Sequence, residues 1–132
     1  MKSLSLLLLR FAGLFAMIGA FLGAHMAGSQ GEAYALRPIH AHILVVGWLT
    51  LFAWSAFYLL FETQFKKLAY THAWTGIIGS TGLTAGMWLY MVRPFEVSES
   101  FTFLFYIGGG SLLLLSFALF LVLTFLVSPR KR

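Results

Sequence analysis

Cysteine is absent from the 132-residue chain, which excludes disulfide bonds, thiolate zinc sites and iron–sulfur clusters. Charge is scarce as well: charged residues make up 10% of the chain, and its only acidic residues are four glutamates. Hydrophobic residues account for 60%, and the mean hydropathy is +0.88. This composition is typical of an integral membrane protein with little mass outside the bilayer, and it leaves no room for a soluble domain.

Basic residues are in excess, with a net charge of +5, but they are spread over short loops and chain ends. They therefore report topology and do not predict a nucleic-acid surface. One side is expected to hold Lys2, Arg10, Lys66, Lys67, Arg130, Lys131 and Arg132. The other side is expected to hold Arg37, Arg93, Glu32, Glu96 and Glu99. The positive-inside rule then predicts a multi-pass protein of the inner (plasma) membrane with both termini in the cytoplasm.

Long apolar stretches predict an all-α membrane protein with four transmembrane helices, at about residues 4–26, 38–61, 68–92 and 101–127. Short connections predict a single up-down bundle that covers residues 1–132. The first stretch is interpreted as a retained helix and not a signal peptide, because Arg10 interrupts its apolar run and no Ala-x-Ala site follows. The third stretch repeats small residues that predict close helix packing: Gly76, Gly79, Gly82 and Gly86.

The main candidate site is the histidine pair at the start of the second stretch, in the segment Arg37-Pro38-Ile39-His40-Ala41-His42. Histidine inside a membrane is a site candidate because an unpaired polar ring is costly there. Residues two apart on a helix lie about 200° apart, so His40 and His42 face different neighbours and cannot bind one ion together. Gly47 returns nearly to the face of His40, about 10 Å deeper, and is expected to leave room for a flat macrocycle.

The order Arg37-Pro38-x-His40, then Gly47, resembles the second helix of the catalytic subunit of heme-copper oxidases and nitric oxide reductases, especially the C-family oxidases. The His40-Ala41-His42 pair also resembles the tenth helix of that subunit, where two histidines serve two different hemes. The stretch at 68–74, with Gly79 seven residues after His72, is similar to the eleventh helix. The resemblance covers about residues 37–93.

This resemblance implies an architecture and a cofactor. The family's catalytic subunit consists of three four-helix arcs about a pseudo-threefold axis, and this chain has the length of one arc. A homotrimer would offer His40 of one copy and His42 of the next to the iron of a b-type heme, non-covalent because cysteine is absent. A dimer would also pair the two histidines, and the arc analogy favours three copies. Arg37 and Arg93 are candidates for binding the heme propionates.

The leading hypothesis is therefore a bis-histidine heme protein of electron transfer, with quinol or a small redox protein as partner. A minimal gas-reactive oxidase or nitric oxide reductase is the alternative, and it needs an open position on the iron. Copper is not expected, because the family's copper site needs three histidines and only His25 and His72 remain here. His25 is a candidate extra ligand, whereas His72, expected at the opposite membrane face, is interpreted as structural or proton-handling.

Two further alternatives hold no heme: a small transporter and an assembly subunit. Proton-coupled transporters typically need a carboxylate within the membrane. All four glutamates of this chain fall in loops or at the ends of spans, which disfavours the transporter.

Overall fold

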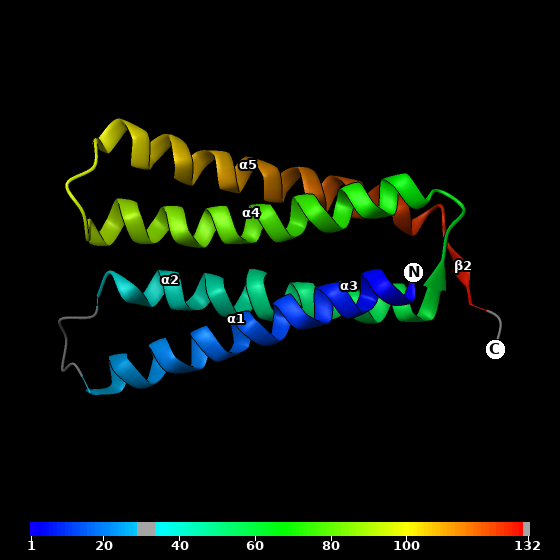
Figure 1. The fold of residues 1–132 in the computed structure, drawn as a ribbon, viewed down its shortest axis with the longest axis horizontal. Coiled ribbons are helices and arrows are strands. Elements are labelled where there is room, and N and C mark those ends of the chain that lie inside the picture. Colours follow the sequence, from blue (N-terminus) through cyan, green and yellow to red (C-terminus); the bar gives the residue numbers. More distant parts are fainter. Residues whose placement is uncertain (29–33, 131–132) are drawn as a thin grey trace.

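The computed structural model describes residues 1–28 and 34–130, and these are mostly helical (Figure 1). The helices are α1 (Lys2–Gly28), α2 (Leu36–His42), η1 (Ile43–Leu49), α3 (Thr50–Leu60), α4 (Lys66–Val92) and α5 (Glu99–Thr124). The segments α2, η1 and α3 form one uninterrupted helix, since the residues at both junctions keep right-handed helical dihedral angles. The four predicted helices are thus confirmed. Three residues used for the predicted topology, Glu32, Lys131 and Arg132, lie outside the described residues.

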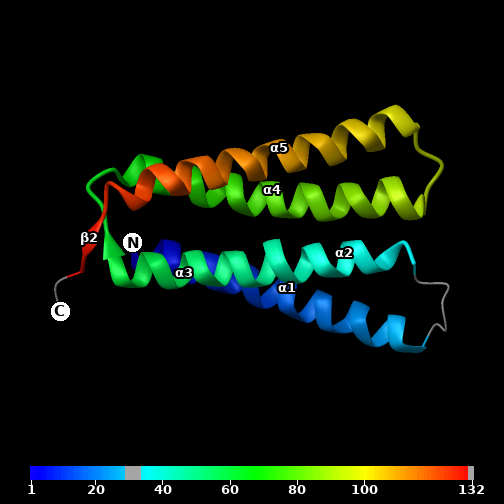
Figure 2. The ribbon, with the colours of Figure 1, turned by 180° about the vertical axis from the view of Figure 1, so that it is seen from behind.

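The helices run alternately up and down, as predicted (Figures 1 and 2). The last turn of α1, the first turn of α2, the last turn of α4 and the first turn of α5 share one end of the molecule, here called the histidine end. The N-terminus, the first turn of α4 and a short two-stranded sheet lie at the opposite end, here called the sheet end. Ser98 caps the N-terminus of α5, because its hydroxyl accepts a hydrogen bond from the backbone N–H of Phe101.

Three helices of the described chain are long and apolar enough to cross a membrane: α1, the continuous helix Leu36–Leu60, and α5. The span expected at 68–92 is confirmed as a helix, but α4 is not among these three. It lies between the continuous helix and α5, and it buries polar side chains such as His72, Ser80 and Thr84 against these neighbours. A helix covered on two sides can be less apolar than one that faces lipid.

Glycines set the close contact between α4 and α5, as the three- and four-residue spacing predicted. A Cβ atom at Gly79 would lie 2.5 Å from the amide nitrogen of Leu113, and one at Gly86 would lie 2.5 Å from the Cα of Tyr106. Gly82 faces Gly109, whose Cα would be 3.0 Å from a Cβ on Gly82. Backbones approach this closely only where side chains are missing, so these positions hold α5 on α4.

The first helix packs along the continuous helix through apolar side chains and one polar contact. Leu4, Leu8 and Ala12 are buried in this interface. At the sheet end, the hydroxyl of Ser5 donates to the backbone oxygen of Ser55, and the hydroxyl of Ser55 donates back to the oxygen of Ser5. This reciprocal pair satisfies both buried hydroxyls and fixes the register of α1 on α3.

The short sheet was not predicted. Strand β1 (Phe61–Glu62) pairs antiparallel with β2 (Ser128–Pro129), and the backbone N–H of Arg130 donates to the oxygen of Leu60. The hydroxyl of Thr63 adds a hydrogen bond to the backbone oxygen of Leu126 at 3.0 Å. These contacts connect the end of α5 to the end of α3, although the two helices are far apart in the sequence.

Candidate functional site

The two histidines lie in the last turn of α2 and point in different directions, as the spacing predicted. His40 points toward α1: a Cβ atom at Gly23 would lie 3.0 Å from the Cε1 of its ring and 3.7 Å from each ring nitrogen. The Nδ1 atom of His40 is buried, and it has no hydrogen-bond partner in the described structure. Buried polar atoms are usually paired, so this nitrogen is either a cost to the fold or reserved for a ligand.

His42 is half-buried and has one bonded ring nitrogen. Its Nδ1 lies 2.7 Å from the backbone oxygen of Pro38, one turn earlier. A carbonyl oxygen can only accept, so Nδ1 carries the proton and Nε2 carries the free lone pair. A backbone carbonyl that orients Nδ1–H is a common arrangement for a histidine that binds a metal through Nε2.

Within one chain, no free space for a flat macrocycle lies beside Gly47. Gly47 lies on the same side of the helix as His40, since both meet α1, but the ring of Phe15 covers it. A side chain at residue 47 would collide with Phe15, and Gly47 is buried. The glycine here admits an aromatic ring of α1.

A π-helix, which was not predicted, follows the histidines directly. In η1, the N–H of Thr50 bonds to the oxygen of Val45, five residues earlier, and the hydroxyl of Thr50 reaches the same oxygen at 2.8 Å. π-helices are rare, usually occur within α-helices, and are frequent at functional sites. The sequence carried no clear signal for it: Ile39, Ile43, Gly47 and Leu51 are four residues apart and all buried, but most residues between them are apolar as well.

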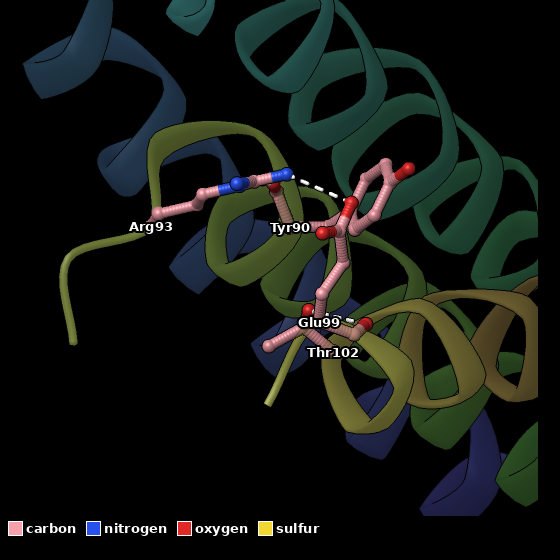
Figure 3. A network of polar contacts seen from close by, with 4 residues as sticks. All are labelled: Tyr90, Arg93, Glu99 and Thr102. Carbon is pink, nitrogen blue, oxygen red and sulfur yellow. Dashed lines mark hydrogen bonds and ion pairs between the residues drawn. The ribbon is translucent and has the colours of Figure 1, made fainter. Parts of the chain in front are cut away.

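Both predicted propionate ligands are exposed cations at the histidine end. The guanidinium of Arg37 lies 4.8 Å from the ring centre of Tyr34. Arg93 ends α4 in a left-handed conformation, with φ 51° and ψ 54°. Its guanidinium forms an ion pair of 2.9 Å with Glu99 and a hydrogen bond to the oxygen of Tyr90, beside the Glu99–Thr102 contact (Figure 3). Neither arginine is buried, so both can reach an anion at this end.

His72 is fully buried between α3 and α5, away from the histidine end. Its Nδ1 lies 2.7 Å from the hydroxyl oxygen of Tyr58. The rings of Trp54 and Phe120 flank it, with centroids at 4.4 Å and 5.4 Å. His25, in the last turn of α1, is exposed. Among residues 1–28 and 34–130, no three histidines or glutamates come together to hold a metal ion.

Two apolar grooves of about 700 and 410 Å³ run along α4, and both include Phe11 and Thr81. The hydroxyls of Thr81 and Thr84 donate to backbone oxygens of α4 itself, so the grooves offer few free polar groups. None of the five predicted site residues lines either groove.

No protein-family model, curated protein or solved structure matches this chain. The resemblance to the heme-copper oxidase superfamily therefore stays a prediction that depends on the residues of the chain. The structure contributes the setting of those residues, above all the hydrogen bond that leaves Nε2 of His42 with a free lone pair.

Proposed function

We propose that this chain is a membrane-embedded b-type heme protein of electron transfer, in which heme is held between subunits by His40 of one copy and His42 of the next. The observation that carries this proposal is the 2.7 Å contact from Nδ1 of His42 to the oxygen of Pro38. It selects the tautomer whose Nε2 can bind iron, and it fixes the plane of the ring.

The fit of the second histidine supports a site between chains. The ring of His40 meets Gly23 of its own α1, whereas His42 lies on another side of the same helix. One chain cannot bring both rings to one iron. The Nδ1 atom of His40 is buried and unpaired within its own chain in the described structure, so the other ring nitrogen, Nε2, is the one that would bind iron.

The surrounding residues suit the rest of the cofactor. Arg37 and Arg93 are accessible at the histidine end, where they would bind the propionates through charge-assisted hydrogen bonds. Gly47 has no contact with heme in this proposal unless Phe15 moves. Heme with two histidine ligands supplies reversible one-electron oxidation of its iron, and the chain supplies the ligands, an apolar setting and the anchoring cations.

The assembly and topology complete the proposal. A homotrimer is favoured over a dimer because the chain has the length of one oxidase arc. Both termini would be cytoplasmic in the inner (plasma) membrane, since Lys2, Lys66 and Lys67 gather at the sheet end of the helices. The histidine end then faces outward, and quinol or a small redox protein would exchange electrons there.

One observation favours a second function. The contact between His40 and Gly23 leaves His42 as the better-placed ligand. If His42 alone binds iron, a position stays open for a gas, and the protein is then a minimal oxidase or nitric oxide reductase.

Optical spectra of the detergent-purified protein, oxidised and reduced, with and without carbon monoxide, test both functions. We expect sharp low-spin bands that carbon monoxide does not change, and their loss in both His40→Ala and His42→Ala. His25→Ala tests the candidate extra ligand, since this exposed histidine lies at the same end of the molecule, and bands that persist in this variant would leave His40 and His42 as the ligands. A carbon monoxide shift would select the gas-reactive function. A colourless protein after expression with added heme would refute both and favour a transporter or an assembly subunit.

A further inference from the structure

One hydrogen bond connects α4 to the turn that follows the histidines. The hydroxyl of Ser80 donates to the backbone oxygen of Val46, inside η1, at 3.1 Å, and Ser80 is fully buried. Within the described residues, it is the one hydrogen bond from an α4 side chain to the backbone of the continuous helix. Ser80 therefore contacts the π-helix at a carbonyl group.

The π-helix sets the directions of the side chains in the residues that precede it, 36–42. A π-turn holds one more residue than an α-turn, so η1 contains one extra residue. The α-helical segments before and after η1 keep the relative rotation that they would have without that residue. The buried positions show this effect. Four-residue steps in an α-helix drift by about 40° each, yet Ile39, Ile43, Gly47 and Leu51 all stay buried.

Conversion of η1 to an α-helix would rotate the histidine segment. With α3 held in place, residues 36–42 would turn by about 100°, so that each takes the angular position now held by the residue before it. His40 would then take the direction of Ile39, which is buried, and His42 would take the direction of Ala41, which is exposed. The orientation of both histidines thus depends on the extra residue.

We propose that Ser80 is a positioning residue that keeps η1 in its π form and thereby sets the directions of His40 and His42. Its hydroxyl binds a carbonyl oxygen of the widened turn, which an α-helical turn would present at a different angle. The link to heme rests on the proposed function, whereas the link to the rotation of the helix does not.

The absence of cysteine allows a direct test by thiol labelling. The single variants Ile39→Cys and Ala41→Cys are labelled with a water-soluble maleimide in detergent. They report a buried and an exposed position, about 4.5 and 7.5 Å along the axis from Leu36. We expect Ala41→Cys to react faster in the otherwise unchanged protein. In the Ser80→Ala background, labelling of Ala41→Cys should slow and labelling of Ile39→Cys should accelerate.

Thr84→Ala is the matched control, because the hydroxyl of Thr84 is also buried in α4 but donates to the oxygen of Ser80 in the same helix. This variant should leave both labelling rates unchanged. Ser80→Thr keeps a hydroxyl and should preserve the original order. Unchanged rates in Ser80→Ala would overturn the proposal.

Deletion of Val45 gives an independent test that does not require Ser80→Ala to fold. Val45 is exposed, and removal of one residue from η1 allows a continuous α-helix with His40 and His42 in their present directions. The labelling order should persist in this variant, and Ser80→Ala should add no change to it. Reversal of the order by the deletion would contradict the proposal.

Spectra of the same variants separate the two proposals. If heme is bound, Ser80→Ala should lose the low-spin bands and the deletion variant should keep them. A colourless parent protein whose labelling still responds to Ser80→Ala would refute the heme function and support the positioning role. Intact spectra together with unchanged labelling in Ser80→Ala would refute the positioning role alone.

Discussion

The hydroxyl oxygen of Tyr58 lies 2.7 Å from Nδ1 of His72, and this pair joins α3 to α4 where both side chains are fully buried. The same hydroxyl donates to the backbone oxygen of Ala69 at 3.1 Å. Because tyrosine has one hydroxyl proton, both bonds form together when Nδ1–H of His72 donates to the tyrosine oxygen. The Nε2 atom of His72 then lies among aromatic rings with no hydrogen-bond partner in the described structure.

Substitution of Tyr58 by phenylalanine should therefore destabilise the protein. It leaves Nδ1 of His72 buried and unpaired, and we expect a loss of about 1 kcal/mol in the free energy of unfolding. The measurement is reversible unfolding in mixed detergent micelles. Tyr70→Phe is the control, because Tyr70 is exposed and its hydroxyl makes one long contact of 3.4 Å; its effect should stay within about 0.5 kcal/mol. Equal losses in the two variants would contradict this role for Tyr58.

Two adjacent glycines of α5 should respond in opposite ways to alanine. A Cβ at Gly109 would collide with the backbone of Gly82 and Leu83, so Gly109→Ala must push α5 away from α4. We expect a loss of about 1–3 kcal/mol, typical of an overpacked interface. Nothing lies within 4 Å of a Cβ at Gly108, and Gly108→Ala should be neutral or stabilising by up to about 1 kcal/mol, the helix propensity of alanine over glycine. Thermal unfolding measures the effect of each variant. Comparable losses of stability in Gly108→Ala and Gly109→Ala would contradict the close α4–α5 contact.

The four helices were predictable from the sequence because long, largely apolar stretches separated by short polar connections favour helices of about this length. The predicted ranges 38–61 and 68–92 differ from Leu36–Leu60 and Lys66–Val92 by at most two residues at each end. The glycine spacing of α4 likewise predicted close packing against another helix, because only small residues permit such an approach, and the structure shows that this helix is α5.

Other features depend on contacts between distant parts of the chain and were not predictable in the same way. The π-helix is held by Ser80, which is 34 residues from Val46, and the short sheet pairs Phe61 with Pro129. The opposite directions of His40 and His42 followed from helical geometry alone. The residue that covers Gly47 could not be predicted in this way, because spacing along one helix does not show that Phe15 of another helix contacts Gly47.

Arg93 should reveal whether its unusual backbone serves the candidate site. A left-handed conformation costs a residue with a Cβ about 1 kcal/mol, whereas glycine adopts it freely. Arg93→Gly should therefore be about 1 kcal/mol more stable than Arg93→Ala, which loses the same exposed ion pair with Glu99 but keeps the strain. If the guanidinium binds a propionate, both variants should lose heme more readily than the unchanged protein, as measured by transfer to apomyoglobin. Heme retention equal to that of the unchanged protein would remove Arg93 from the site.

Mixed oligomers should show whether the two ligands come from different chains. His40→Ala retains His42, and His42→Ala retains His40, so neither variant alone completes a site between copies. When both are expressed together with distinguishable tags and purified through both tags, a dimer with one of each regains one of its two sites, and a trimer of mixed composition regains one of three. Low-spin bands should therefore return in the doubly purified protein. The heme content per chain should be about half that of the unchanged protein for a dimer and about one third for a trimer. Each variant expressed alone with both tags is the control and should stay colourless. Bands that fail to return would contradict a heme site shared between His40 of one copy and His42 of the next.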